Sequence, residues 1–332
     1  MKGACPAITV MTCTYNGGRF IPRCYATLAM QTFADWEWLV IDDGSTDGSI
    51  ELLEQIAASD PRVRVERHSP NRGRAFSRSR ALELVRADWV ALWDVDDFFF
   101  PGRLEAIAAA GREGYDYWVS RAVQTDLSLR IVGVQDFDRP FPGLNIRTGL
   151  HGAMAYRTDL GRRIGYQPHL TTYGGMGEDA AILYTLALRH KGMLEERPLM
   201  VNVTGHEVVV HKSMAAREVV IETLERLWQQ GDLPLSKAKM DSVLNRMRWR
   251  NRTLSMFKLF PPLYPIIMRT RIRGRRVEGT NLEGEYRQFV VDIARRYPAR
   301  GRDVLPVTQF GTDAIRDRHN SDSSLEPLGE KS

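Results

Sequence analysis

The sequence contains little cysteine and no long apolar run. Its three cysteines, Cys5, Cys13 and Cys24, are odd in number, lie near the amino end and lack CxxC spacing. They indicate neither a disulfide framework nor a zinc site, and a reducing, cytoplasmic environment fits such a chain. No stretch approaches the about 18 to 20 apolar residues that cross a bilayer, and the first residues lack the apolar core of a signal peptide. We therefore expect neither export nor a membrane-spanning helix.

Acidic residues are missing between Ser242 and Val277. The basic residues of this stretch are Arg246, Arg248, Arg250, Arg252, Lys258, Arg269, Arg271, Arg273, Arg275 and Arg276. Because the whole chain has a net charge of +5, these ten charges leave about −5 for the rest. An apolar run broken by prolines, Met256–Met268, lies among them.

Two interpretations of this basic segment remain open. Residues 246–276 would contact an anionic membrane surface, which would make the protein peripheral at the inner face of the cell membrane. Alternatively, they form a helical subdomain that packs on the core with its arginines in water. Nucleic acid is the least favoured partner, since no recognition module accompanies the segment.

The pattern of apolar residues indicates an α/β fold. At 332 residues and 43% hydrophobic content, the chain can bury one substantial core with a smaller unit attached. Short apolar runs that end in polar loops alternate with helix-like segments. The predicted strands are 7–12, 36–41, 62–66, 89–93 and 115–120, and the predicted helices are 50–57, 75–85 and 102–110. This alternation predicts a doubly wound, mostly parallel, Rossmann-like central sheet.

The pattern loosens after residue 120. Residues 121–126 and 129–135 are typical of antiparallel strands, and helices are predicted from Glu178 to near His190 and over Met214–Gln230. We expect a catalytic domain over residues 1–215, a basic C-terminal helical extension over 216–300 and a disordered tail over 301–332.

Three polar clusters directly follow predicted strands: Thr14-Tyr15-Asn16, Asp42-Asp43 and Asp94-Val95-Asp96-Asp97. In an open parallel sheet, ligands bind at the carboxyl ends of the strands. Three aspartates within four positions repel one another, and a hard divalent cation such as Mg²⁺ or Mn²⁺ relieves that repulsion. The alternative is a solvated or helix-capping turn. Trp93 and Phe98–Phe100 are expected to be core or wall rather than a platform for a sugar.

At these residues the chain resembles the family 2 inverting glycosyltransferases of the GT-A fold. The resemblance covers roughly residues 7–215 and is more specific than any single motif, because several motifs match in order and spacing. They are Ile8-Thr9-Val10-Met11-Thr12-Cys13-Thr14-Tyr15-Asn16, Gln31-Thr32-Phe33, Leu39-Val40-Ile41-Asp42-Asp43-Gly44-Ser45-Thr46-Asp47-Gly48, Asn71-Arg72-Gly73 and Leu92-Trp93-Asp94-Val95-Asp96-Asp97.

The resemblance implies binding of a nucleoside-diphosphate sugar, with UDP favoured as the nucleotide. The implied donor-binding residues are Thr14, Tyr15, Asn16, Asp43, Arg72, Asp94 and Asp96, and the implied metal site comprises Asp96, Asp94, Asp97 and His211. His211 follows an apolar run, and a structural role for it is equally open.

The resemblance also implies the reaction. Glu178-Asp179 matches the acidic pair that carries the general base, so Asp179 would deprotonate the acceptor hydroxyl while the sugar is transferred with inversion. The alternative for this pair is an acidic first helical turn. A surface glycan or a lipid-linked glycan is the expected acceptor.

Three other functions share single features with this sequence. In a phosphatase of the haloacid dehalogenase type, a small hydroxyl residue would stand two places after the second aspartate of Asp94-Val95-Asp96, but this chain has Phe98 at that position. A nucleotidyltransferase would have a glycine-rich basic loop after its first strand, where this chain has only Gly17-Gly18-Arg19. A non-catalytic sugar-nucleotide scaffold would have lost a catalytic carboxylate, whereas Asp43, Asp96 and Asp179 are all present.

Overall fold

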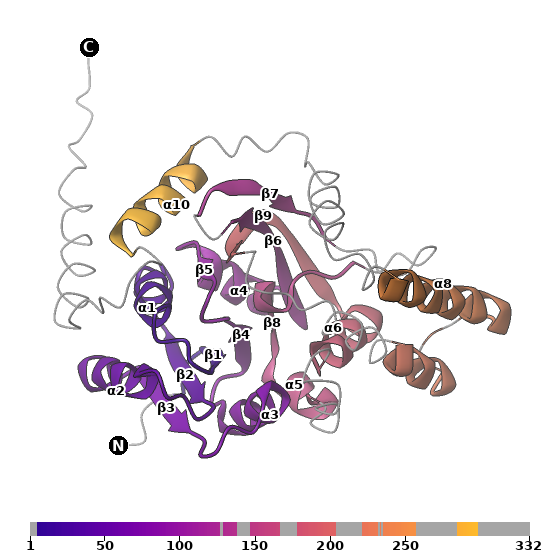
Figure 1. Cartoon of the computed structure of the whole chain (residues 1–332), viewed down its shortest axis with the longest axis horizontal. Coiled ribbons are helices and arrows are strands. Elements are labelled where there is room, and N and C mark those ends of the chain that lie inside the picture. The colour runs from indigo at the N-terminus through magenta and orange to yellow at the C-terminus, as the bar shows by residue number, and fades with distance from the viewer. Residues whose placement is uncertain are drawn as a thin grey trace, which may run out of the picture.

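The computed structural model describes residues 5–126, 129–137, 147–166, 178–203, 221–231, 233, 235–256 and 284–297. Over these residues the chain forms one nine-stranded sheet in the order β3-β2-β1-β4-β8-β6-β9-β5, with β7 paired to the edge of β6 (Figure 1). Helices lie against the sheet. The predicted α/β class is therefore confirmed.

One half of the sheet is parallel and builds the predicted alternation. Its strands are β3 (Val63–Arg67), β2 (Trp36–Asp42), β1 (Ile8–Thr14) and β4 (Trp89–Leu92). The connecting helices are α1 (Ile21–Ala29), α2 (Ser49–Ser59) and α3 (Arg74–Leu84). Every residue of β2 is buried, as expected for a parallel strand covered on both faces. Because these strands are parallel, their carboxyl ends meet at one edge.

The other half of the sheet is mixed. It consists of β8 (Met154–Arg157), β6 (Tyr117–Thr125), β9 (Gly192–Val203), the short β5 (Phe98–Phe99) and β7 (Ile131–Gln135). The strands β8, β5 and β7 are antiparallel to their neighbours, while β9 runs parallel to β6.

The predicted strand boundary at residue 120 is wrong. β6 continues as one strand from Tyr117 to Thr125, and its register against β9 shifts on both sides of Arg121. Such a bulge lets a strand bend without ending, so a polar residue inside it imitates a boundary in the sequence pattern.

Four further helical segments complete the domain next to this half of the sheet. They are α4 (Arg103–Arg112), the short 3₁₀ helix η1 (His151–Ala153), α5 (Thr158–Ile164) and α6 (Glu178–Arg189). The predicted helix from Glu178 to near His190 is thus confirmed as α6.

Part of the predicted helical extension has its own small core. Helix 221–229 and α8 (Lys237–Met256) bury Ile221, Leu224, Leu227, Met240, Val243 and Leu244 together, and this cluster contacts α6 through Tyr184 and Leu188. Within the described residues, no helix is long and apolar enough to cross a bilayer. His211, most of the stretch 246–276 and the tail 301–332 lie outside the described residues or have no described side chains.

The last described helix, α10 (Glu285–Arg296), returns to the sheet (Figure 1). It buries Val290 and Ile293 in the same apolar core as the strands. Its Phe289 ring lies 6.3 Å from the ring of Phe98 and 4.7 Å from that of Phe100. α10 therefore covers the segment that follows the Asp94–Asp97 turn.

Candidate active site

A cleft of about 1040 Å³ opens at the carboxyl ends of β1, β2 and β4. It brings together all the predicted donor-binding residues, which the sequence separates by as many as 82 positions. The lining residues are Cys13, Thr14, Tyr15, Asn16, Gly17, Phe20, Asp43, Asn71, Arg72, Gly73, Arg74, Ser77, Arg78, Asp94, Val95, Asp96, Asp97 and Asn202. The position of the cleft agrees with the rule for open parallel sheets.

The loop after β1 presents Tyr15 to solvent. Tyr15 is 54% exposed, and among the described residues it is the large apolar side chain that stands out as exposed. Asn16 adopts a left-handed backbone (φ 52°), its N–H donates to Ser45 Oγ at 2.9 Å, and its side-chain oxygen accepts from the Thr46 N–H at 2.8 Å. This loop is therefore held against the loop after β2, and the Tyr15 ring offers a flat face for stacking.

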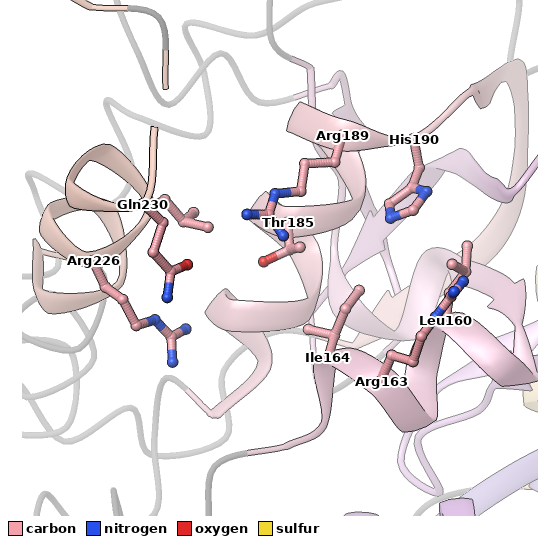
Figure 2. Close-up of a pocket in the computed structure, with 9 residues that line it drawn as sticks. Leu160, Arg163, Ile164, Thr185, Arg189, His190, Arg226 and Gln230 are labelled. Carbon is pink, nitrogen blue, oxygen red and sulfur yellow. The ribbon is translucent and has the colours of Figure 1, made fainter. Parts of the chain in front are cut away.

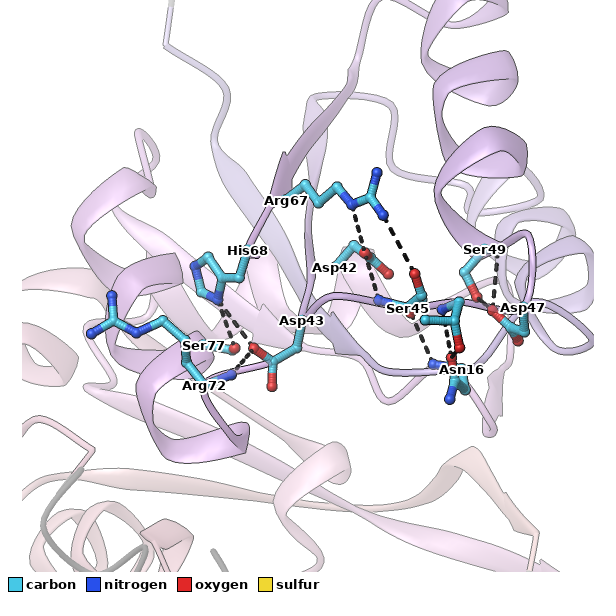
Figure 3. A network of polar contacts seen from close by, with 11 residues as sticks. Asn16, Asp42, Asp43, Ser45, Asp47, Ser49, Arg67, His68, Arg72 and Ser77 are labelled. Atoms are coloured by element: carbon cyan, nitrogen blue, oxygen red, sulfur yellow. Dashed lines mark hydrogen bonds and ion pairs between the residues drawn. The ribbon is translucent and has the colours of Figure 1, made fainter. Parts of the chain in front are cut away.

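The two aspartates at the end of β2 have different partners. Asp42 accepts a hydrogen bond from the Ser45 N–H at 3.1 Å, so it organises its own turn. Asp43 is buried and reaches the loop after β3: it accepts from the N–H groups of Arg72 (2.9 Å) and Gly73 (2.8 Å), as Figure 3 shows for Arg72. Only Asp43 of the pair lines the cleft.

Arg72 enters the cleft in a fixed orientation. Its guanidinium carbon lies 3.4 Å above the centre of the Phe76 ring. Stacking of this kind restricts a long, flexible side chain while leaving its N–H groups free to meet an anion in the plane. Arg72 therefore lines the cleft and contacts Asp43 through its backbone, while its guanidinium stacks on Phe76.

The acidic turn after β4 contains carboxylates in three environments. Asp94 is 35% exposed at its side chain and accepts from Arg78 Nη2 at 3.2 Å. Asp97 is buried and accepts from the N–H of Val203 (3.0 Å) and from the amide of Asn202 (3.1 Å). Burial, and then the charges of Asp96 and Asp94, raise the pKa of Asp97 well above its ordinary value. Asp96 is partly exposed at the cleft.

These residues fit a cation that is shared with phosphates. Among the residues that the structure describes, no three His, Cys, Asp or Glu side chains are grouped to hold a metal ion by themselves. Asp94 and Asp96 nevertheless both face the cleft. Mg²⁺ is usually bound through one or two carboxylates, with substrate phosphates and waters completing its shell. Asp97 is directed instead at Asn202 and Val203.

Three arginines surround the acidic turn, and none of them belongs to a predicted motif. Arg78 faces Asp94, and buried Arg23 donates from Nη2 to the backbone oxygen of Asp96 at 2.8 Å. Arg103, 0% exposed, donates from Nη2 to the carbonyl oxygens of Leu92 (3.2 Å) and Gly152 (2.8 Å).

The buried guanidinium of Arg103 also lies against the rings of Trp93, Phe99 and Trp118. Burial lowers its pKa to about 9, against the opposing effect of Asp94 and Asp97, so it is charged at neutral pH. The negative charge of the acidic turn is therefore partly compensated by the three neighbouring arginines. The sequence signal was an arginine at a helix position whose neighbours three and four residues away are apolar, as Arg78 is between Ala75 and Leu82.

The predicted general base lies at the start of α6. Asp179 is the second residue of this helix and is partly exposed. It is not among the described residues that line the cleft, and residues 167–177, which precede the helix in the sequence, lie outside the described part of the chain. The assignments of Asp179, Glu178 and His211 stay predictions.

A second, smaller cavity of about 430 Å³ lies between α5, α6 and helix 221–229 (Figure 2). Its wall includes Arg163, Arg189, Arg226 and His190, and it shares no lining residue with the cleft. Arg163 and Arg189 stand in the last turns of α5 and α6, where cations stabilise the helix dipole. His190 lies 3.6 Å from Asp116. Arg163 and Arg189 therefore have a structural explanation.

Comparison with known proteins places this geometry in context. Residues 9–164 match the family model described as glycosyl transferase family 2. Over 100 residues the chain is 34% identical to a putative teichuronic acid biosynthesis glycosyltransferase of Bacillus subtilis, TuaG; this covers 30% of this chain and 40% of TuaG. It is 28% identical to the succinoglycan biosynthesis protein ExoU of Rhizobium meliloti over 73% of each chain.

Solved structures resemble the fold over most of the chain. Residues 1–349 of TarS from S. aureus, in complex with UDP, match with a TM-score of 0.55 at 15% identity, covering 97% of this chain and 94% of that one. The mannosyltransferase PcManGT from Pyrobaculum calidifontis, in complex with GDP-Man and Mn²⁺, matches with a TM-score of 0.51 at 13% identity, covering 98% and 89%. At these identities the likeness shows the fold, which is of the GT-A type.

Proposed function

Through residues 9–164 the chain belongs to glycosyl transferase family 2, and from this premise we propose that it is an inverting glycosyltransferase. It would transfer a sugar from a nucleoside-diphosphate donor to an acceptor hydroxyl in the synthesis of a surface polysaccharide or glycolipid. One observation carries the proposal: Tyr15, Asp43 and Arg72 share a single cleft with the acidic turn at the carboxyl ends of the strands.

The donor nucleotide is proposed to lie across this cleft. The base would stack on exposed Tyr15, with Asp43 accepting a hydrogen bond from a base N–H group, while Arg72 and Arg78 face the diphosphate. UDP is the proposed nucleotide. Support comes from TarS, whose structures contain UDP and UDP-GlcNAc, whereas PcManGT contains GDP-Man.

A divalent cation, Mn²⁺ or Mg²⁺, is proposed to be held by Asp96 and Asp94, and Asp97 and His211 are the further proposed ligands. When bound, the cation would neutralise charge that develops on the leaving diphosphate. Asp94 is also paired with Arg78, so the chain itself supplies a second cation at the same carboxylate. The Mn²⁺ in the PcManGT complex supports this assignment.

The acceptor is proposed to be activated by Asp179, with Glu178 beside it. Asp179 would accept the hydroxyl proton while the acceptor oxygen forms its bond to the anomeric carbon. The bond from that carbon to the diphosphate breaks on the opposite face, and its electron pair leaves with the diphosphate. Positioned acid–base groups typically contribute about 10²- to 10⁴-fold to rate. A glycan or lipid-linked glycan is the proposed acceptor, and the biosynthetic roles named for TuaG and ExoU support it.

Residues 246–276 are proposed to hold the protein at an anionic membrane surface on the cytoplasmic side. We also propose that residues 1–215 form the catalytic domain and 216–300 the extension that carries this segment. Two contacts favour the competing subdomain interpretation: Arg248 pairs with Glu225 on the neighbouring helix at 2.6 Å, and Met247 packs against the small core of the extension. Sedimentation with phosphatidylserine vesicles decides between them, since failure to bind at low salt removes the membrane contact.

The activity is tested by release of UDP from a panel of UDP-sugars with and without Mn²⁺. Wild-type protein is expected to release UDP, and Asp179→Asn and Asp96→Ala to lose at least 100-fold in rate. Arg112→Gln is a matched control, because Arg112 pairs with Glu105 on the exposed side of α4. Proton NMR of the first product formed would report an inverted anomeric configuration.

Two outcomes would overturn this function. Retention of configuration would exclude the inverting route. Silence of the wild-type protein with UDP-, GDP- and dTDP-sugars, in the presence of metal and glycan acceptors, would instead support a scaffold that binds sugar nucleotides without reacting.

A further inference from the structure

His68 is a buried histidine that none of the predicted motifs includes. It directly follows β3 and is 8% exposed. Its backbone N–H donates to the carbonyl oxygen of Asp42 at 2.8 Å, which fixes its position beside the end of β2. Although it does not line the cleft, its ring reaches a residue that does.

The contact is with Asp43. His68 Nδ1 lies 3.2 Å from Asp43 Oδ1 and also 3.2 Å from the hydroxyl of Ser77 (Figure 3). A carboxylate only accepts hydrogen bonds, so a bond between Asp43 and this nitrogen requires the proton on Nδ1. His68 is then the one side chain, among the described residues, that donates to the Asp43 carboxylate; the other donors are the backbone N–H groups of Arg72 and Gly73.

The His68 ring also contacts Phe76, the ring on which Arg72 stacks. The His68 ring packs edge-on against Phe76, with centroids 5.2 Å apart and planes at 64°. Phe76 in turn carries the Arg72 guanidinium at 3.4 Å. The backbone N–H of Arg72 also donates to Asp43 at 2.9 Å, so these four residues form a closed ring of contacts. His68 therefore contacts Asp43 itself and the ring that supports Arg72, and the donor is proposed to meet both of these groups. Of the two, His68 forms a hydrogen bond with Asp43 and not with Arg72.

We propose that His68 is a positioning residue for recognition of the nucleobase. Its Nδ1–H holds the Asp43 carboxylate in the rotation that leaves an oxygen lone pair directed into the cleft, where a base N–H would bind. This role rests on the proposed function, because it assigns His68 to the donor site described above. It acts on the base end of the donor and not on its diphosphate.

A space-filling role predicts something different. If His68 only filled volume, replacing it would weaken every ligand of the cleft in parallel with a loss of stability. If it orients Asp43, replacing it should lower the affinity for a nucleotide but not the affinity for a bare diphosphate. Two substitutions at position 68 place a hydrogen-bond donor at different points. In His68→Asn the Nδ2 occupies the place of the histidine Nδ1, whereas in His68→Gln the amide extends toward the place of Nε2.

The experiment is titration calorimetry of the full-length protein with UDP and with inorganic pyrophosphate, both in Mn²⁺. For His68→Ala we expect UDP affinity to fall about 10-fold, because a hydrogen bond to a charged group is lost. Pyrophosphate affinity should stay within about twofold. His68→Asn should bind UDP within about threefold of wild type, and His68→Gln should resemble His68→Ala. His190→Ala is the matched control, since it removes an imidazole 3.6 Å from an aspartate outside the cleft.

Each result decides the proposal. Equal losses for UDP and pyrophosphate, or unchanged UDP binding by His68→Ala, overturn the positioning role while leaving the proposed function standing. Should His68→Ala fail to fold, the pair His68→Asn and His68→Gln answers the question, and equal affinities of the two contradict it. If wild-type protein binds none of UDP, GDP and dTDP, the proposed function itself fails and the role of His68 falls with it.

Discussion

Gly152 offers a direct test of how tightly the acidic turn is packed. It lies in η1, next to the turn and to β9. A methyl group added at Gly152 would lie 2.9 Å from Asp94 Oδ2 and 2.9 Å from Met200 Cε. Both approaches are shorter than side-chain carbons normally tolerate. Met200 is almost fully buried, whereas the Asp94 side chain is 35% exposed, so the carboxylate is the group with room to move.

For Gly152→Ala we therefore expect a rotated Asp94 and a weakened contact between Asp94 and Arg78. Overpacking of this kind costs about 1 to 3 kcal/mol, and with a mobile partner we expect the lower end, about 1 kcal/mol. In a chain of 332 residues that lowers Tm by roughly 1 to 2 °C. Because Asp94 is a proposed donor and metal residue, Mn²⁺-dependent UDP affinity should fall about 10-fold, close to 1.4 kcal/mol.

Thermal unfolding and calorimetry measure these two effects. The control is Gly133→Ala in β7, where an added methyl meets no atom within 4 Å. Should Gly152→Ala match Gly133→Ala in both Tm and UDP affinity, η1 does not press on the carboxylate, and the packing argument is refuted.

Three further predictions concern the surroundings of the cleft. Phe289→Ala should lower the free energy of unfolding by about 2 kcal/mol in urea, since its partly buried ring packs on Phe98 and Phe100; no loss would mean that α10 is not docked. Burial raises the pKa of the Cys13 thiol to about 12, so its thiolate fraction at pH 8 is about 10⁻⁴, and mass spectrometry should find iodoacetamide on exposed Cys5 long before Cys13. Equal labelling would contradict the raised pKa of Cys13. Burial, then the charges of Arg78 and Arg74, hold the pKa of His151 well below its ordinary 6.5. The unfolded state therefore binds the extra proton, and stability should fall as pH drops from about 6.5 to 5. His151→Gln should flatten that slope, and an unchanged slope would exclude His151 as its source.

Much of the parallel half could be predicted because its signals are local. Each strand there is a short apolar run that stops at a polar loop, and α/β alternation leaves few ways to arrange such units. Most residues that line the cleft come from the ends of those strands and the loops that follow them, and the others come from α3 and β9. The parallel direction of the strands was therefore enough to predict that these loops lie together at one edge of the sheet.

Other features depend on contacts that no short stretch of sequence reveals. The sequence presents Asp42 and Asp43 as equivalents, and only the turn geometry assigns one to its own loop and the other to the cleft. Arg103 reads as an ordinary residue at the start of a helix, yet it is completely buried among rings and carbonyl groups. A charged side chain is expected outside unless its partners are known, and those partners lie up to 51 residues away.

The return of α10 to the sheet has a consequence for synthesis in the cell. Phe98 and Phe100 leave the ribosome about 190 residues before Phe289, their cover, has been made. At about 5 to 20 residues per second, that interval lasts roughly 10 to 40 s. During it, a nascent chain with a nearly finished sheet presents an uncovered aromatic surface beside the acidic turn. A ribosome-bound chaperone would find a binding site there, and release of the finished chain would remove it.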